Sequence, residues 1–166
     1  MRWKVIAGGL AILMVSTASA GNAVVVAPAG EFSASGELAL KKGHIPVSCD
    51  TTFNGHVADG GGIRVTSVSF GGLNPLCKSI KALGLPWRGQ VDSPYQLTVV
   101  DMQVKVRVPL LGGICGPGPV SLAWENEGAE ATFDAVSLAP DCAMNGTMQT
   151  SPQVDIQAAT PLVMQH

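Results

Sequence analysis

The chain has 166 residues, of which 46% are hydrophobic and only 13% charged, and its formal net charge at pH 7 is −2. In soluble domains about a quarter of the residues are usually charged, so we expect this protein to have a surface with few charges. The sequence shows no basic stripe, and without one the phosphate attraction that dominates nucleic-acid binding is missing. The composition argues against a nucleic-acid partner. It suits a protein that packs against copies of itself, a cell surface or an apolar substance, or one with a hydrated Ser/Thr surface.

The N-terminus has the pattern of a secretory signal peptide. A short positive stretch, residues 1–4, precedes the apolar run Val5–Val15, and Ala18 and Ala20 fit the A-x-A cleavage rule. We therefore predict cleavage before Gly21. The alternative is an uncleaved anchor, but eleven apolar residues are too few to span about 30 Å of hydrocarbon as a helix. No other stretch is long and apolar enough, so we expect no transmembrane segment in the mature chain.

The remaining 146 residues, 166 less 20, are enough for one domain with a real core. We predict a single β-domain over residues 21–166. Because Arg2 and Lys4 lie in the leader, this part has 8 basic residues, 10 less 2, against 12 acidic ones, and a formal charge of −4.

The first third of the mature chain alternates between apolar and polar residues. Residues 21–30 are apolar and extended but interrupted by Pro28, which predicts either an edge strand or an extended arm. Residues 31–40 form a strand pattern that ends in a turn at Lys41-Lys42-Gly43. The inward candidates of this strand are Phe32, Leu38 and Leu40. The next strand begins at Ile45, where Pro46 indicates an edge or strand-start position.

Two cysteine-bracketed units follow the same outline. Each holds two strand patterns with a polar turn between them. In the first unit, between Cys49 and Cys77, the strands are Thr51–Val57 and Ile63–Phe70 and the turn is Asp59–Gly62. In the second unit, between Cys115 and Cys142, the strands are Val120–Trp124 and Ala131–Leu138 and the turn is Glu125–Gly128. Their similar length suggests a two-part β-fold.

The segments between and after these units complete the pattern. Lys78–Leu83 allows one short helical turn closed by Gly84, and Leu85-Pro86-Trp87 is typical of a buried corner. The longest strand pattern, Tyr95–Val108, is long enough to require a bend. A last strand is predicted over Gln153–Gln157 with Val154 and Ile156 inward, and residues 158–166 should be a loose tail. About eight to ten short strands predict an all-β antiparallel sandwich or barrel.

All four cysteines lie in the exported part, where the environment is oxidising, and their spacings do not match a zinc site. Two disulfides are therefore expected. We favour Cys49 with Cys77 and Cys115 with Cys142, because each pair would then staple one hairpin unit. A crossed pairing is the natural alternative if the two hairpins lie in facing sheets.

The sequence offers no convincing catalytic or metal site. The imidazoles are His44, His56 and His166, and only His56, with Asp50 and Asp59, could form an acid-base or metal group. Alternation places His56 and Asp50 on an exposed face, where solvated polar residues are the rule. No nucleophile elbow, zinc-protease, P-loop or dinucleotide motif occurs. We predict no enzyme, no catalytic or metal residues and no cofactor.

Two weaker motifs and two tryptophans remain. The acidic glycine turn at Asp59 lacks the carboxylates that calcium demands, and Asn145-Gly146-Thr147 has the form of a glycosylation sequon. If exposed, Trp87 and Trp124 could stack on sugars or rest on an oily surface, so both are candidates for a binding surface. Burial in the core is the more frequent fate of such residues.

The sequence resembles the alkane oxidation activators, the PraA/PraB type of small exported proteins of pseudomonads and related bacteria. The residues that carry the resemblance are Ser35–Gly43, Val47–Cys49, Phe53–Gly55, Val65–Phe70, Cys77, Gly84–Trp87, and Cys142 with Gly146. The resemblance covers most of the mature chain. It implies a secreted protein, extracellular or periplasmic, that promotes growth on hydrocarbons or access to them, and it carries over no catalytic residues.

Two mechanisms fit this resemblance. In the first, the protein is a surface-active or binding module that contacts oil or the cell envelope. In the second, it is a homo-oligomeric subunit of an extracellular fibre or biofilm matrix, and the arm Gly21–Ala29 adds as a strand to a neighbour's open edge.

Overall fold

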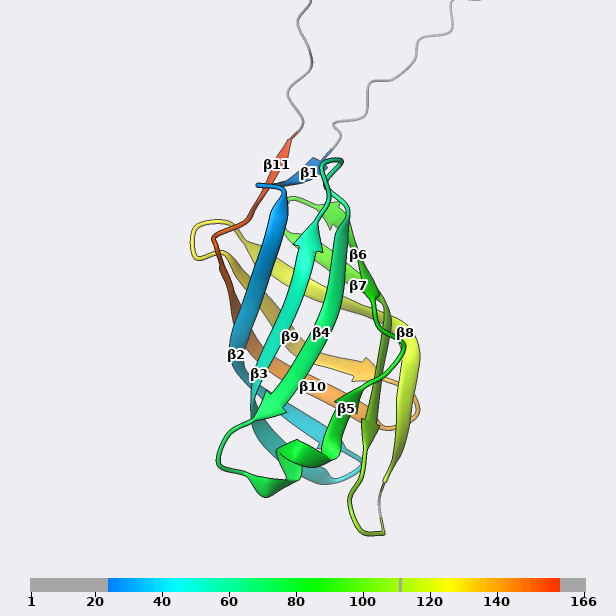
Figure 1. Cartoon of the computed structure of the whole chain (residues 1–166). Helices are drawn as coiled ribbons and strands as arrows, with labels where there is room; N and C mark the ends of the chain where they lie inside the picture. The colour runs from blue at the N-terminus through cyan, green and yellow to red at the C-terminus, as the bar shows by residue number, and fades with distance from the viewer. Residues whose placement is uncertain (1–23, 111, 159–166) are drawn as a thin grey trace, which may run out of the picture.

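The protein is described by a computed structural model over residues 24–110 and 112–158, and this part is all-β (Figure 1). It contains eleven strands and one short 3₁₀ helix. In chain order these are β1 (Val24–Ala27), β2 (Gly30–Lys42), β3 (Ile45–Val57), β4 (Ile63–Gly71), η1 (Pro75–Ser79), β5 (Ile80–Ala82), β6 (Trp87–Ser93), β7 (Gln96–Val106), β8 (Gly113–Glu125), β9 (Glu130–Leu138), β10 (Cys142–Ser151) and β11 (Asp155–Ala158).

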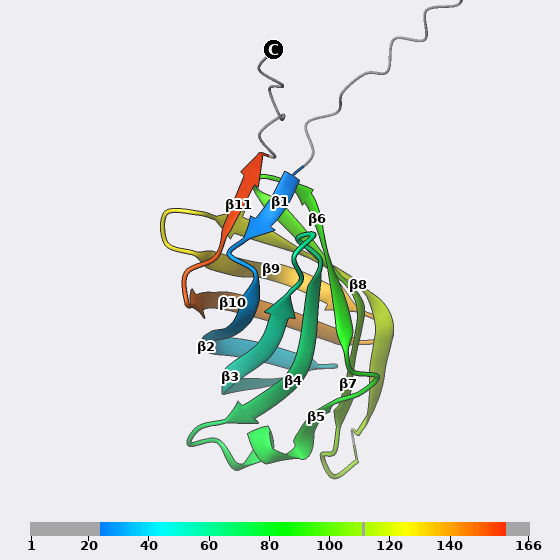
Figure 2. The same cartoon turned by 45° about the horizontal axis from the view of Figure 1, so that its top comes forward.

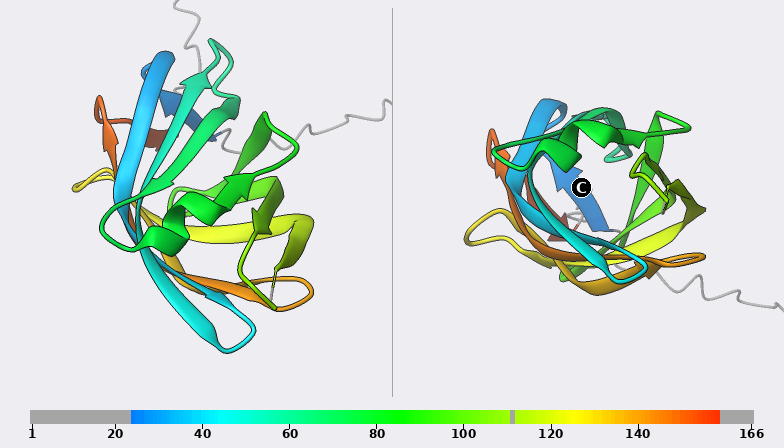
Figure 3. Two further views of the ribbon diagram at one scale, coloured as in Figure 1. Left: turned by 60° about the horizontal axis from the view of Figure 1, so that its bottom comes forward. Right: turned by 90° about the horizontal axis from the view of Figure 1, so that it is seen from below.

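Eight strands close into an antiparallel barrel. The barrel consists of β2, β3, β4, β6, β7, β8, β9 and β10. Each strand pairs with the next one in this list, and β10 pairs with β2 to close the barrel. Figure 3 shows the closed ring from below. Of the two predicted architectures the barrel is therefore the correct one. The two cysteine-bracketed units are not separate parts, because their strands belong to one continuous sheet.

The barrel wall follows from alternation of the side chains. Along β3, the odd-numbered positions from Val47 to Val57 are buried and the even-numbered ones are exposed or half-buried, as a half-buried strand requires. The inward side chains of all eight barrel strands meet in one hydrophobic core. Phe53 lies in this core, edge-on to Trp87 at a centroid distance of 5.8 Å and to Phe133 at 6.2 Å.

The predicted bend in the long strand is a β-bulge in β7. Val99 points inward, and after a register shift against β8 the inward positions become Met102, Val104 and Val106. A bulge inserts a residue and so exchanges the two faces of a strand. It explains why the apolar face of this sequence changes from odd to even positions near Val100.

The predicted helical turn over Lys78–Leu83 is wrong. The helical residues are those of η1, Pro75–Ser79, and Ile80–Ala82 form β5 instead. The helix starts earlier because the Asn74 side chain accepts a hydrogen bond from the Leu76 amide at 3.0 Å and Pro75 occupies the first helical position. Ile80 then pairs with Val106 of β7, which draws the following residues into the sheet.

The eleven strands exceed the eight to ten expected because β5 and the β1–β11 ribbon are short strands beside the eight strands of the barrel. β5 and β6 pair with the two ends of β7, so together they occupy one strand position of the barrel. The predicted edge strand near the N-terminus is β1, which pairs with β11 in a ribbon across one end of the barrel (Figure 2). Val154 and Ile156 are buried as predicted. The predicted signal peptide, residues 21–23 and the part of the predicted tail after residue 158 lie outside the described residues.

The up-and-down topology gives the barrel two distinct ends (Figure 1). At the ribbon end lie the β1–β11 ribbon and the β3–β4, β6–β7 and β8–β9 turns. At the opposite end, called here the η1 end, lie η1, the β2–β3 and β9–β10 turns and the β7–β8 loop.

Candidate functional site

The barrel interior contains an apolar cavity of about 70 Å³ beneath the β1–β11 ribbon. Residues from all eight barrel strands contribute to its wall, and β6 contributes only the backbone of Gly89. Among them are Phe53, Leu122, Trp124, Ala131, Phe133 and Met148. Two of these positions, Ala131 and Ala34 of β2, carry small side chains where larger ones would fill the space. The cavity therefore exists because the inward pattern is apolar but not uniformly bulky.

The cavity contains no group suited to acid-base chemistry. None of its lining residues is ionisable, and the only polar side chains among them are Thr98 and Thr150. The Thr150 hydroxyl donates to the Ala129 carbonyl at 3.2 Å, and the Thr98 hydroxyl donates to Asp92. Because both hydroxyls already have partners, the cavity presents an apolar surface. Such cavities stay dry and accept small apolar molecules.

The β1–β11 ribbon covers the cavity through Val26 and Ile156, which are both buried and both line it. The two strands pair from Val24 with Ala158 to Ala27 with Asp155. Figure 2 shows the ribbon crossing the end of the barrel. The ribbon is thus the part of the molecule that separates the cavity from solvent at this end.

Asn126, in the β8–β9 turn, fastens the ribbon to the barrel. Its side-chain amide donates to the Ile156 carbonyl at 2.9 Å, and its side-chain oxygen accepts from the Ile156 amide at 2.9 Å. The same oxygen accepts from Nε1 of Trp124 at 2.6 Å. One side chain thereby joins β11 to the tryptophan that lines the cavity.

The two tryptophans that the sequence nominated for a binding surface are buried, Trp87 at 0% and Trp124 at 6% exposure. Neither offers an exposed ring to sugar or oil. The Trp87 indole donates to the Leu83 carbonyl at 2.8 Å and packs against Phe53, as expected for a buried corner. Trp124 lines the cavity, so any contact with a ligand would take place inside the barrel.

The predicted histidine and acidic residues do not form a site. His56 and Asp50 both lie on the exposed face of β3, as predicted. They are six residues apart on one strand, which corresponds to roughly 20 Å. Asp59 lies in the β3–β4 turn, where the Ala58 amide donates to the Gly62 carbonyl at 2.8 Å. His44 is exposed at the η1 end, and His166 lies outside the described residues.

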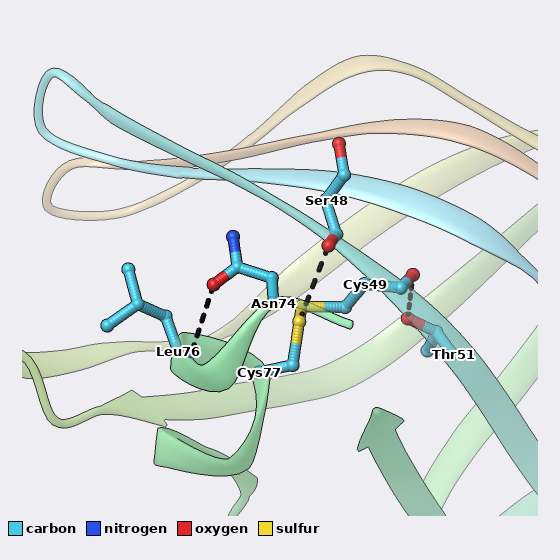
Figure 4. Close-up of a disulfide and its surroundings, with 6 residues drawn as sticks. All are labelled: Ser48, Cys49, Thr51, Asn74, Leu76 and Cys77. Carbon is cyan, nitrogen blue, oxygen red and sulfur yellow. Dashed lines mark hydrogen bonds between the residues drawn. A yellow bond between two sulfur atoms is a disulfide. The ribbon is translucent and has the colours of Figure 1, made fainter. Parts of the chain in front are cut away.

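The favoured disulfide pairing is confirmed. Cys49 is bonded to Cys77 and Cys115 to Cys142, with Cα–Cα distances of 5.7 and 6.0 Å. Figure 4 shows the first bond joining β3 to η1, with the Cys77 sulfur 3.4 Å from the Ser48 carbonyl oxygen. Within the described residues, the one cluster of metal-ligand types is Cys115, Asp141 and Cys142. Its two sulfurs are in a disulfide, so they lack the thiolate charge that binds metal.

The family-model comparison matches residues 1–158 of the chain to the PraA/PraB-like alkane oxidation protein activators. The chain belongs to this family. Neither the search of curated proteins nor that of solved structures finds a match. The family is named for activators, and two disulfides indicate an oxidising compartment. No helix in the described part of the chain has the length and hydropathy needed to cross a membrane.

Sequence reasoning identified the inward faces of the strands but missed the cavity. Phe32, Val57 and Met148 face it from three different strands. The available signal was the pair of alanines, Ala34 and Ala131, at positions that alternation directs inward. Alternation alone cannot say that two such alanines line the same space, because that depends on the register between strands far apart in the chain.

Proposed function

We propose that the protein is an exported, non-enzymatic accessory of hydrocarbon use that accepts a short apolar molecule, or the end of a hydrocarbon chain, in the cavity beneath the β1–β11 ribbon. The apolar wall without ionisable groups is the observation that supports this proposal. Family membership supplies the link to alkane oxidation.

The cavity volume limits what can bind. A water molecule occupies about 30 Å³ of liquid, and a cavity of about 150 Å³ in another protein accepts benzene. At about 70 Å³ the present cavity has room for only a few carbon atoms. A longer alkane enters by one end only, and deeper entry requires the ribbon to move. The protein is accordingly proposed to hold or present hydrocarbon rather than to enclose it.

Methyl NMR with pentane as the probe tests this proposal. In the disulfide-bonded protein, we expect saturating pentane to shift the methyl signals of cavity residues such as Val26 and Met148, while methyls at the η1 end stay unchanged. The substitution Ala131→Leu adds three carbons inside the cavity and should abolish these shifts. Ala39→Leu, at a half-buried position between two inward residues of β2, is the matched control and should preserve them.

The proposal fails if pentane shifts no cavity methyl, or if it shifts them equally in the Ala131→Leu protein. The stability of that variant is an internal check. Filling a cavity without strain commonly stabilises a protein by about 0.5 to 2 kcal/mol, whereas overpacking destabilises it.

A matrix subunit is the second candidate function. The edge of β4 that faces away from β3 is paired with β6 only at Ile63–Val65, which leaves the rest of that edge without a backbone partner in the described residues. Such an edge is a template for an added strand. The proposed donor, β1, is however already paired with β11 of its own chain. Assembly would require this ribbon to open.

Size-exclusion chromatography with negative-stain microscopy distinguishes the two candidates. Filaments that disappear when Gly21–Ala29 is deleted would favour the matrix subunit. A stable monomer with a pentane-dependent NMR response would favour the binding module.

A further inference from the structure

The basic residues of the described chain gather at the η1 end of the barrel. Six of its eight Lys and Arg residues lie there, on the end of β2, on η1 and β5, and on the end of β7 and the loop that follows it. They are Lys41, Lys42, Lys78, Lys81, Lys105 and Arg107. Two of them, Lys81 and Lys105, are directly paired across β5 and β7. The sequence shows no basic run here because the chain brings these residues together from three separate segments.

This positive charge is only partly compensated. Lys42 forms an ion pair with Asp141 at 2.5 Å, and the other ion pair among the described residues joins Arg88 to Asp101 on the side of the barrel. Two other acidic residues lie toward this end, Asp50 beside Gly72 and its exposed cross-strand partner Glu37, so three carboxylates face six basic side chains. Most of the remaining basic side chains are exposed. The η1 end therefore carries a net positive charge, although the mature chain as a whole is acidic.

Two fully exposed leucines project from the same end. Leu73 lies between β4 and η1, and Leu110 lies in the β7–β8 loop. Both loops follow strands that run toward the η1 end, β4 and β7, so the topology places both loops at that end of the barrel (Figure 1). A leucine that is exposed in water gains free energy when it enters an apolar phase.

The ribbon end has the opposite character. It carries most of the acidic side chains, and the basic residues nearest to it in the described chain are Arg64 and its cross-strand partner Arg88, which is ion-paired with Asp101. The acidic residues are Glu31, Asp59, Asp92, Glu125, Glu127, Glu130 and Asp155. The barrel is thus charged with opposite sign at its two ends, which would orient it in front of a negatively charged surface.

We propose that the η1 end docks on an anionic lipid surface, with the basic side chains at the headgroups and Leu73 and Leu110 inserted among the acyl chains. Lysines and exposed apolar loop tips together are the combination that binds peripheral proteins to anionic bilayers. A nucleic acid or an acidic protein would satisfy the charges but gives the leucines no apolar phase. The proposed orientation directs the ribbon and its cavity away from the lipid, and it does not depend on the cavity binding anything.

Co-sedimentation with vesicles tests the proposal on the disulfide-bonded protein. The vesicles contain phosphatidylcholine alone or with about a third of phosphatidylglycerol. We expect binding to the anionic vesicles only, and weaker binding at high salt. Each lysine near such a surface contributes roughly fivefold in affinity, so Lys78→Gln/Lys81→Gln should lose more than tenfold. Leu73→Ser/Leu110→Ser should weaken binding severalfold.

Two control variants at the ribbon end make the test specific. Arg64→Glu changes the net charge by the same amount as Lys78→Gln/Lys81→Gln, and Tyr95→Ser removes an exposed apolar side chain at that end. Both should bind as the unmodified protein does. Far-UV circular dichroism confirms that each variant is folded.

Three results would overturn the proposal. The first is an absence of binding to anionic vesicles, and the second is an equal loss of binding in the control variants. The third is a leucine variant that binds like the unmodified protein while heparin competes fully, which would indicate a site for soluble polyanions in place of a lipid surface.

Discussion

Asn126→Ala should release the β1–β11 ribbon from the barrel. The substitution removes three side-chain hydrogen bonds, two to the backbone of Ile156 and one from the Trp124 indole. Only the two bonds to Ile156 hold the ribbon, and each has a net contribution of about 0.5 to 1.5 kcal/mol. The expected cost is about 2 kcal/mol. This cost corresponds to a roughly 30-fold rise in the population with an open ribbon.

Hydrogen exchange measures this opening directly. A detached two-stranded ribbon is only marginally stable in water, so the amides of β1 and β11 should exchange roughly 30-fold faster in the variant. The amide of Met102, in the barrel wall, serves as the reference for global unfolding. Asn126→Asp keeps the accepting oxygen and loses the donor, so it should give an intermediate rate. Glu127→Ala, in the same turn, should change nothing.

The reasoning is refuted if β1 and β11 exchange at the same rate in Asn126→Ala as in the unmodified protein. It is also refuted if Met102 accelerates as much as the ribbon does, because the hydrogen bonds would then stabilise the whole barrel and not its cover.

Three further predictions concern the barrel itself. Replacing Cys49 and Cys77 by Ser opens a loop of sequence separation 28, which frees the unfolded chain and should lower the free energy of unfolding in urea by about 3 to 4 kcal/mol. The Cys115/Cys142 pair, with a separation of 27, should give a similar loss. A negligible loss in either variant would contradict the argument that the disulfides act by restricting the unfolded chain. Phe133→Ala empties a fully buried position against Phe53 and should cost about 3 to 5 kcal/mol, a value that a retained urea midpoint would disprove. Gly36→Ala would place a Cβ in steric clash with the Thr147 carbonyl oxygen, so the thermal midpoint of this variant should fall by several degrees. Gly60→Ala has open space around the new Cβ and should keep the original midpoint.

The local structure was largely readable from the sequence. Alternation predicted the burial of Leu38 and Leu40 and of Val154 and Ile156, and the outline of the two hairpin units predicted the correct cysteine pairs. These features depend on residues close together in the chain or on one strand. The predicted helical turn failed because Ile80 pairs with Val106, a partner 26 residues away, and that pairing overrides local periodicity.

The candidate site was less predictable for the same physical reason. A cavity wall is assembled from strands whose mutual register is set by barrel closure, and no local pattern records it. The sequence nominated Trp124 for an exposed binding surface, whereas it is buried against the cavity. The charge at the η1 end was likewise hidden, because its lysines come from separate segments.

The pairing of β10 with β2 joins Cys142 to Lys42 and Ser151 to Ser33, across about a hundred intervening residues. Contacts of such long range are costly to form, and proteins dominated by them fold slowly. Until this last seam forms, the sheet has two free edges that can pair with other chains. A chain that stops before Cys142 should therefore aggregate instead of forming a smaller barrel. Because the β10–β2 pairing closes the barrel, the hydrophobic core is enclosed only when all eight barrel strands are present.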